Sequence, residues 1–194
     1  MPEPAFAAVI LAGGTGVRLD GADKAALDLE GRTLLHHAVH AVRGALPIVV
    51  VADPVDPATL GGAAVRFVRE EPAYGGPAAA LLTGIDELPE GSTTVVVLAV
   101  DMPRVTRDTV ARLLEAGRGG DGAALVDPRG RRQLAMALDL ARVRQCAPAR
   151  GTWHGLPMRS LLAPLELVAV EPVGEEGRDV DDWSDLRDLR NLGP

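Results

Sequence analysis

The stretch AAVIL at residues 7–11, followed by the glycine-rich segment AGGTGVRL at residues 12–19, decides the fold class of this chain. A continuous apolar run is typical of a strand that is covered on both faces, as in a parallel sheet. Glycines in the segment that follows let the backbone turn sharply and bring its N–H groups close to an anion. The two segments together predict a central strand whose carboxyl end opens into a phosphate-binding loop.

Two common phosphate-binding motifs do not fit this loop. The Rossmann fingerprint G-x-G-x-x-G begins at Gly14 and Gly16, but Leu19 stands in place of its third glycine. The Walker A motif G-x-x-x-x-G-K-[ST] has Gly16 and Gly21 at the right spacing, but Ala22 stands where its lysine belongs. The remaining interpretations are a different anion-binding loop, which we favour, and an ordinary glycine-rich turn between a strand and a helix.

Two basic residues support anion binding by the loop. Arg18 lies within the glycine-rich segment, and Lys24 follows it directly after Asp23. Lys24 is the only lysine of the chain, although Lys and Arg together number 20. Because all the other basic residues counted here are arginines, the single lysine indicates a specific role at this position; the alternative is that it occurs there by chance. We expect both cations to face the phosphates of a ligand.

The rest of the chain alternates short apolar runs with amphipathic stretches, which is the pattern of β-α-β units. Further strands are predicted at 48–51, 65–68, 94–100, 123–126, 134–138 and 165–170. Helices are predicted at 33–43, from Pro77 onward, from an N-cap at Thr106 to residue 116, and from an N-cap at Ser184. A chain of 194 residues has the length of one domain. We therefore expect a single domain over residues 1–194, with a three-layer α/β architecture and a mostly parallel sheet.

The composition excludes several classes of protein. A net charge of -7 argues against a nucleic-acid-binding protein, which would show a basic excess. No apolar run reaches the roughly 18 residues of a membrane span. Cys146 is the only cysteine, which excludes an internal disulfide and a cysteine-cluster zinc site. Because the first residues, MPEP, lack a basic segment, we expect no secretory signal peptide and a cytoplasmic location.

Two acidic sites could hold a metal ion. Asp101 directly follows the most apolar of the predicted strands, so its carboxylate would stand at the carboxyl edge of the sheet, where ligands bind. The segment DVDD at residues 179–182 contributes further carboxylates, of which Asp181 is our candidate. Mg²⁺ usually takes one or two carboxylates together with phosphate oxygens and water. The alternatives are a turn or capping role for Asp101 and a solvated acidic turn for the later segment.

The pattern of Leu11-Ala12-Gly13-Gly14, Arg18-Leu19 and Asp23-Lys24 resembles the signature of the molybdenum cofactor guanylyltransferases, within the MobA-like NTP transferases. Later landmarks follow in the same order: Gly76-Pro77, Asp101-Met102-Pro103 and Asp179-Val180-Asp181. The resemblance covers nearly the whole chain. It implies a Rossmann-like nucleotidyltransferase fold.

The resemblance also implies roles for individual residues. Lys24 would contact the phosphates, and Asp101 would bind Mg²⁺ and the nucleotide. With Arg18, whose charge lies at the mouth of the same loop, these two are the expected catalytic residues, and Asp181 is the second candidate ligand of Mg²⁺. The positions expected to bind the nucleotide are Leu11, Ala12, Gly13, Gly14, Lys24, Glu71 and Asp101.

Two departures from the family pattern concern Asp20, where glycine is usual, and the Ala52-Asp53 pair, where the family can have an asparagine that contacts guanine or ribose.

The implied reaction is the transfer of GMP from GTP to the terminal phosphate of molybdopterin, with release of pyrophosphate. GTP and molybdopterin, or its molybdenum complex, would be the substrates. Molybdoenzyme apoproteins or cofactor chaperones are the implied protein partners. The alternatives are a cytidylyl- or sugar-nucleotidyltransferase on the same fold and a non-catalytic nucleotide- or cofactor-binding protein.

Overall fold

The computed structural model describes residues 6–14, 19 and 21–192. Within them, one seven-stranded sheet has the order β5-β4-β1-β6-β8-β7-β9. The strands are β1 (Ala7–Leu11), β4 (Ile48–Val51), β5 (Val65–Val68), β6 (Thr94–Ala99), β7 (Gly122–Val126), β8 (Arg132–Asp139) and β9 (Val168–Val170). Only β8 runs against the others, because it pairs antiparallel with both β6 and β7. The predicted mostly parallel sheet is confirmed.

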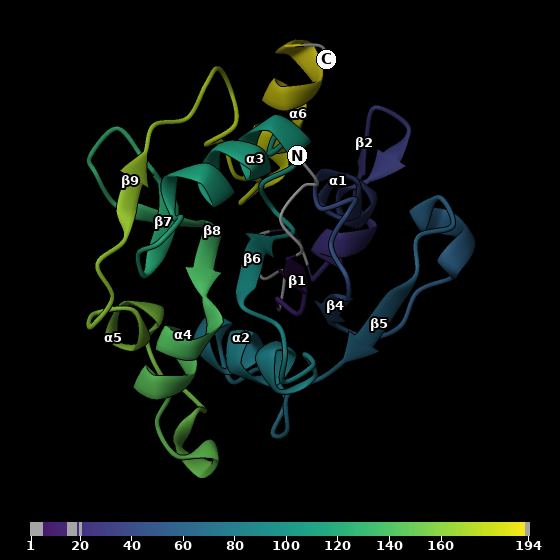
Figure 1. The fold of residues 1–194 in the computed structure, drawn as a ribbon. Helices are drawn as coiled ribbons and strands as arrows, with labels where there is room; N and C mark the ends of the chain where they lie inside the picture. Colours follow the sequence, from purple (N-terminus) through teal and green to yellow (C-terminus); the bar gives the residue numbers. More distant parts are fainter. Residues whose placement is uncertain (1–5, 15–18, 20, 193–194) are drawn as a thin grey trace.

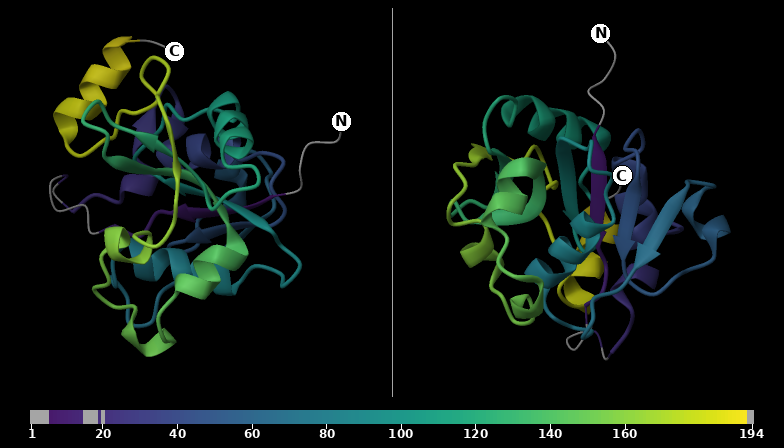
Figure 2. Two further views of the ribbon diagram at one scale, coloured as in Figure 1. Left: turned by 60° about the vertical axis from the view of Figure 1, so that its left-hand side comes forward. Right: turned by 60° about the horizontal axis from the view of Figure 1, so that its bottom comes forward.

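Helices cover both faces of the sheet, giving the three layers seen in Figures 1 and 2. The helices are α1 (Leu34–Ala41), α2 (Pro77–Asp86), α3 (Arg107–Ala116), α4 (Leu140–Cys146), α5 (Met158–Leu161) and α6 (Trp183–Leu192). Strand β1 shows how the two cores are built. Its Ala8 and Ile10 pack with α1, α3 and α6, whereas Ala7, Val9 and Leu11 pack with α2, α4 and α5. Because side chains alternate along a strand, β1 contributes residues to the hydrophobic cores on both faces of the sheet.

Several helix ends follow the predicted chemistry. Thr106 caps α3 through a reciprocal pair of hydrogen bonds with Thr109. Gly76 precedes α2 with a φ of 90°, a conformation that glycine adopts without strain, and Pro77 occupies the first helical turn. The N-terminus of α2 is therefore set at the carboxyl edge of the sheet.

Other elements differ from the predictions. The Ser184 N-cap is wrong: Asp182 accepts the backbone N–H bonds of Ser184 (2.7 Å) and Asp185 (3.1 Å), so Asp182 caps α6. In return, Asp185 accepts the N–H of Asp182 at 3.0 Å, which completes a capping box. The expected strand at 165–170 is shorter, because β9 begins at Val168.

Some short elements were not predicted from the sequence. They are α4, α5, a small hairpin of β2 (Asp28–Leu29) and β3 (Arg32–Thr33), and the 3₁₀ turns η2 (Lys24–Ala26), η3 (Pro57–Leu60) and η4 (Arg150–Thr152). No helix among the described residues is long and apolar enough to cross a membrane.

The close packing of α2 on the sheet yields a testable prediction. A Cβ added at Gly84 would lie 2.5 Å from Val9 Cγ1 and 3.2 Å from Val51 Cγ2. Gly84→Ala should therefore lower the free energy of unfolding by about 1–2 kcal/mol, since overpacking costs more than the helix propensity that alanine gains.

Urea unfolding followed by circular dichroism measures this change. Gly91→Ala is the matched control, because no atom lies within 4 Å of a Cβ added there. Equal stability of the two variants would show that α2 does not depend on this close approach.

Candidate functional site

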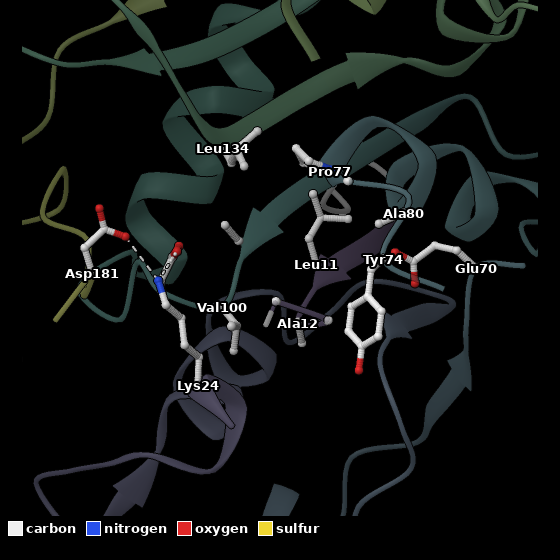
Figure 3. Close-up of a pocket in the computed structure, with 15 residues that line it drawn as sticks. Leu11, Ala12, Lys24, Glu70, Tyr74, Pro77, Ala80, Val100, Leu134 and Asp181 are labelled. Atoms are coloured by element: carbon white, nitrogen blue, oxygen red, sulfur yellow. Dashed lines mark hydrogen bonds and ion pairs between the residues drawn. The ribbon is translucent and has the colours of Figure 1, made fainter. Parts of the chain in front are cut away.

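A cavity of about 570 Å³ lies at the carboxyl ends of β1 and β6. Figure 3 shows Lys24 and Asp181 on one side of it and Tyr74 and Glu70 on the other, with Ala12 between them. The residues that line it are Leu11, Ala12, Gly13, Gly14, Lys24, Glu70, Tyr74, Gly76, Pro77, Ala80, Ala99, Val100, Asp101, Leu134 and Asp181. The cavity thus occupies the edge at which ligands bind in open α/β sheets.

Backbone hydrogen bonds hold the glycine-rich segment against the strand ends. The Ala12 N–H donates to the Val51 carbonyl at 3.2 Å, and the Val100 N–H donates to the Leu11 carbonyl at 3.0 Å. A Cβ at Gly13 would lie 3.3 Å from the Val51 carbonyl oxygen, a tight contact, so glycine lets the chain approach β4 closely there. The cavity floor is consequently made of backbone and small side chains.

The Lys24 ammonium links the two acidic sites. Its Nζ lies 3.2 Å from Asp101 Oδ2 and 3.2 Å from Asp181 Oδ1. The side chain of Lys24 is 16% exposed, so most of it is shielded from water. Asp23 fixes the backbone at the start of η2 by accepting the Ala25 N–H at 3.0 Å. The sole lysine of the chain is therefore held on one side of the cavity, between two carboxylates.

The late acidic segment is positioned by its own backbone. The Val180 N–H donates to the Asp101 carbonyl at 2.8 Å, and the Val180 side chain is fully buried. The Asp181 N–H donates to Asp185 Oδ2 at 2.9 Å, which connects it to the capping box of α6. These contacts bring Asp181 to Lys24 although the two residues are 157 positions apart.

A buried charge cluster secures the loop that leads to this segment. Glu176, which is 7% exposed, accepts the Thr109 hydroxyl at 2.6 Å and the Arg112 guanidinium at 2.7 and 3.0 Å. It also accepts the Val173 N–H at 2.8 Å. Burial raises the pKa of Glu176, but these bonds from Arg112, Thr109 and Val173 outweigh burial and hold the pKa below its usual value. The cluster anchors the loop before Asp179 on α3.

Burial and charge act in opposite directions on the central pair. Burial raises the pKa of Asp101, and Asp179 and Asp181 add to the rise, whereas Lys24 lowers it; the net shift is upward. Burial lowers the pKa of Lys24, but Asp101 and Asp181 outweigh it, so that pKa also lies above its usual value. Lys24 thus opposes the effect of burial on the Asp101 pKa, and the two carboxylates favour the charged form of Lys24.

The structure places most of the sequence candidates on this cavity, with two exceptions. Glu71 is exposed and does not line the cavity, whereas Glu70 is 7% exposed and does. The alternation of β5 would have indicated Glu70, because it lies on the same side of the strand as Val68 in the core beneath α2. Arg18 lies outside the described residues.

A second hollow of about 230 Å³ adjoins the first. The two share Ala12, Gly13, Gly14, Glu70 and Tyr74. Of its polar rim, the sequence pointed only to Asp53, in the Ala52-Asp53 pair, and not to Arg69 or Tyr74. There Arg69 forms an ion pair with Asp53, and its guanidinium carbon lies 5.3 Å from the centre of the Tyr74 ring. The lining of the hollow thus combines small residues with an aromatic ring, one cation and the acidic residues Asp23, Asp53 and Glu70.

The geometry can be compared with known proteins. The family model for the MobA-like NTP transferase domain matches residues 8–170. The chain belongs to the MobA-like NTP transferase family. The match includes the glycine-rich segment, Lys24 and Asp101, and it ends before Asp181.

Two relatives named molybdenum cofactor guanylyltransferase are similar to this chain. The protein of Acidiphilium cryptum is 42% identical over 108 residues, which is 55% of each chain. The protein of Pseudomonas putida is 35% identical over 133 residues, covering 67% of this chain and 69% of the relative. Among solved structures, a nucleotidyl transferase from Methanothermobacter thermautotroptrophicus has a TM-score of 0.77 at 25% identity, covering 97% of each chain.

The opposed effects on Asp101 give a prediction about its titration. The pKa of Asp101 should lie above that of an ordinary aspartate. Lys24→Met should raise this pKa further, because the variant loses the positive charge that lowers it. Since the pKa is raised in the folded state, falling pH through that pKa should increase the free energy of unfolding.

Carboxyl ¹³C NMR titration of the Asp101 side chain measures the effect. Lys24→Arg is the control, because it retains a positive charge beside the carboxylate. A fall in the Asp101 pKa in Lys24→Met would contradict the proposed balance between burial and the lysine.

Proposed function

We propose that this protein is a molybdenum cofactor guanylyltransferase, which transfers GMP from GTP to the terminal phosphate of molybdopterin, and that residues 1–194 act as one nucleotidyltransferase domain. The observation that carries the proposal is the lone lysine held between two carboxylates beside a backbone cradle at the carboxyl edge of the sheet. The names of the two relatives support the choice of nucleotide and acceptor.

The phosphates are held by backbone and by Lys24. Gly13 and Gly14 present backbone N–H groups to them, as glycine-rich segments do for anions. The N-terminus of α2 opens on the same cavity at Gly76 and Pro77, and its dipole favours negative charge there. Lys24 turns from the carboxylates toward the triphosphate. The resemblance adds Arg18 as a further cation.

The donor set around Lys24 suits a magnesium ion. Asp101 and Asp181 already hold one cation, the Lys24 ammonium, through one oxygen each. Two carboxylates are what Mg²⁺ needs when phosphate oxygens and water complete its shell. Among the described residues, no group of three or more His, Cys, Asp or Glu side chains forms a separate all-protein metal site. When bound, the metal ion would supply charge neutralisation for the triphosphate.

The reaction requires no side-chain nucleophile. A terminal phosphate oxygen of the acceptor attacks the α-phosphorus of GTP, and the bond from that phosphorus to the α,β-bridging oxygen breaks. Pyrophosphate leaves with the electron pair of that bond. The protein contributes positioning and stabilisation of the charge that builds on the phosphates, the usual source of catalysis in phosphoryl transfer. Lys24 and the backbone N–H groups supply the stabilisation.

An assay with GTP and molybdopterin that measures the release of pyrophosphate tests the proposal. We expect a metal-dependent reaction that EDTA stops. Lys24→Ala should lower kcat/KM by roughly 10²–10³, the effect of one removed oxyanion donor.

Thermal unfolding with GTP, CTP, ATP and UTP shows which base is bound. GTP at 100 times its Kd should stabilise the chain by roughly 2.7 kcal/mol, or about 5–11 °C in Tm. A shift led by CTP would favour a cytidylyltransferase, and binding without pyrophosphate release would favour a non-catalytic carrier.

The position of Glu70 gives a paired test. Glu70→Gln should weaken GTP binding by about tenfold, because Glu70 is buried against the cavity and a charged hydrogen bond contributes about 1.5–3 kcal/mol. Glu71→Gln, one residue away and exposed, should leave the Kd unchanged. Isothermal titration calorimetry measures both, and the reverse order of effects would restore Glu71 as the nucleotide contact.

A further inference from the structure

Tyr74 stands out among the residues that line the site. It is the only tyrosine of the chain, and it is 58% exposed. It lines both the main cavity and the adjoining hollow. A large aromatic side chain at the junction of two cavities is available to a ligand in either of them.

The backbone of Tyr74 is strained. Its φ is 60°, in the left-handed region that costs a bulky residue free energy and that glycine or asparagine adopts more easily. Gly75 and Gly76 follow it, so the chain had glycine at the next two positions but not here. Strain at a residue that lines a cavity suggests that its side chain is needed there.

Arg69, at the rim of the hollow, holds the Tyr74 ring in place. The Arg69 guanidinium carbon lies 5.3 Å from the ring centre, a favourable cation–π distance. Arg69 is in turn paired with Asp53, which lies just beyond the end of β4. Through this chain of contacts the ring is tied to the sheet, although Tyr74 itself lies in a loop.

The hollow beside the ring has a volume of about 230 Å³ and combines small and acidic residues in its lining. The small ones are Ala12, Gly13, Gly14, Gly21, Ala22, Ala25, Ala52 and Val55, and the acidic ones are Asp23, Asp53 and Glu70. Lys24 and Asp181 lie on the opposite side of Ala12 from Tyr74 (Figure 3). A nucleotide whose phosphates lie at Lys24 would therefore extend its base toward this hollow.

We propose that Tyr74 is the stacking residue for the nucleobase: the base lies in the hollow against the ring, with Arg69 holding the ring. The proposal rests on the proposed function, since it assumes that a nucleoside triphosphate occupies the main cavity. Stacking on an aromatic face favours any base, and a purine offers the larger surface. Tyr74 thus provides affinity for the base without reading its hydrogen-bonding edge.

The test compares ligands with and without a base. Tyr74→Asn should weaken GTP binding by about tenfold, since base–aromatic stacking contributes about 1–3 kcal/mol and 1.4 kcal/mol is a factor of ten. The affinity for tripolyphosphate, which has no base, should stay within twofold. The loss should be smaller for CTP than for GTP. Titration calorimetry with Mg²⁺ present measures all three ligands.

The variants are chosen to separate stacking from folding. Asparagine tolerates the left-handed conformation, so Tyr74→Asn should keep the Tm of the parent chain. Tyr74→Phe retains the ring and should bind GTP within about twofold of the parent. Leu46→Ala, at a residue that is 83% exposed and precedes β4, is the control for loss of an exposed apolar side chain.

The possible results are distinct. An unchanged Kd for GTP in Tyr74→Asn, or an equal loss for GTP and tripolyphosphate, would overturn the stacking role while leaving the proposed function intact. A parent chain that binds no nucleoside triphosphate would contradict the proposed function and the stacking role together.

Discussion

The site depends on one cation held between two carboxylates, Lys24 between Asp101 and Asp181. Three distant parts of the chain meet at its ammonium: the turn after the glycine-rich segment, the end of β6 and the segment before α6. The Lys24 side chain is 16% exposed, so its charge requires compensation, whereas the Asp181 side chain is 47% exposed and stays in contact with water. The two contacts of Lys24 therefore join three segments that lie far apart in the chain.

A lysine suits this position better than an arginine would. The ammonium is a compact charge on a flexible stem, whereas the guanidinium is a broad, planar group that prefers one bidentate partner. Here Nζ contacts two carboxylates through one oxygen each, at equal distances of 3.2 Å. The same flexibility would let Lys24 leave the carboxylates for a phosphate. This gives a physical reason for the only lysine in a chain rich in arginine.

The sequence predicted what depends on local pattern. The apolar run of β1, the Thr106 capping box and the Gly76-Pro77 helix start each depend on a few neighbouring residues, and each appears as expected. Features that depend on distant packing were missed or misplaced. Helix α5 has only four residues and is set by its contacts with α2 rather than by periodicity. The cap of α6 falls on Asp182 because Asp185 completes the reciprocal bonds, which the presence of Ser184 concealed.

The same distinction applies to the site. Motif spacing was enough to place Lys24, Asp101 and the glycine-rich segment at the cavity. The choice between Glu70 and Glu71 depends instead on the direction in which each side chain points just after β5. No sequence motif indicated Tyr74, because its position depends on a left-handed backbone conformation and on the contact with Arg69. Sequence motifs thus locate the Lys24 end of the cavity, where ion pairs between distant segments restrict the residue types.

The two ends of the site differ in the kind of interaction that builds them. At the Lys24 end, the charges of Lys24 and Asp101 are partly shielded from water, so removing Lys24 would leave the Asp101 carboxylate without its partner. At the Tyr74 end, the ion pair of Arg69 and Asp53 lies at the surface, where the Asp53 side chain is 72% exposed and the pair adds little stability. Substitutions there cost the fold little. Under the proposed function, preference for a base would change through exposed residues around the hollow, while the chemistry would stay with Lys24 and Asp101 at the strand ends.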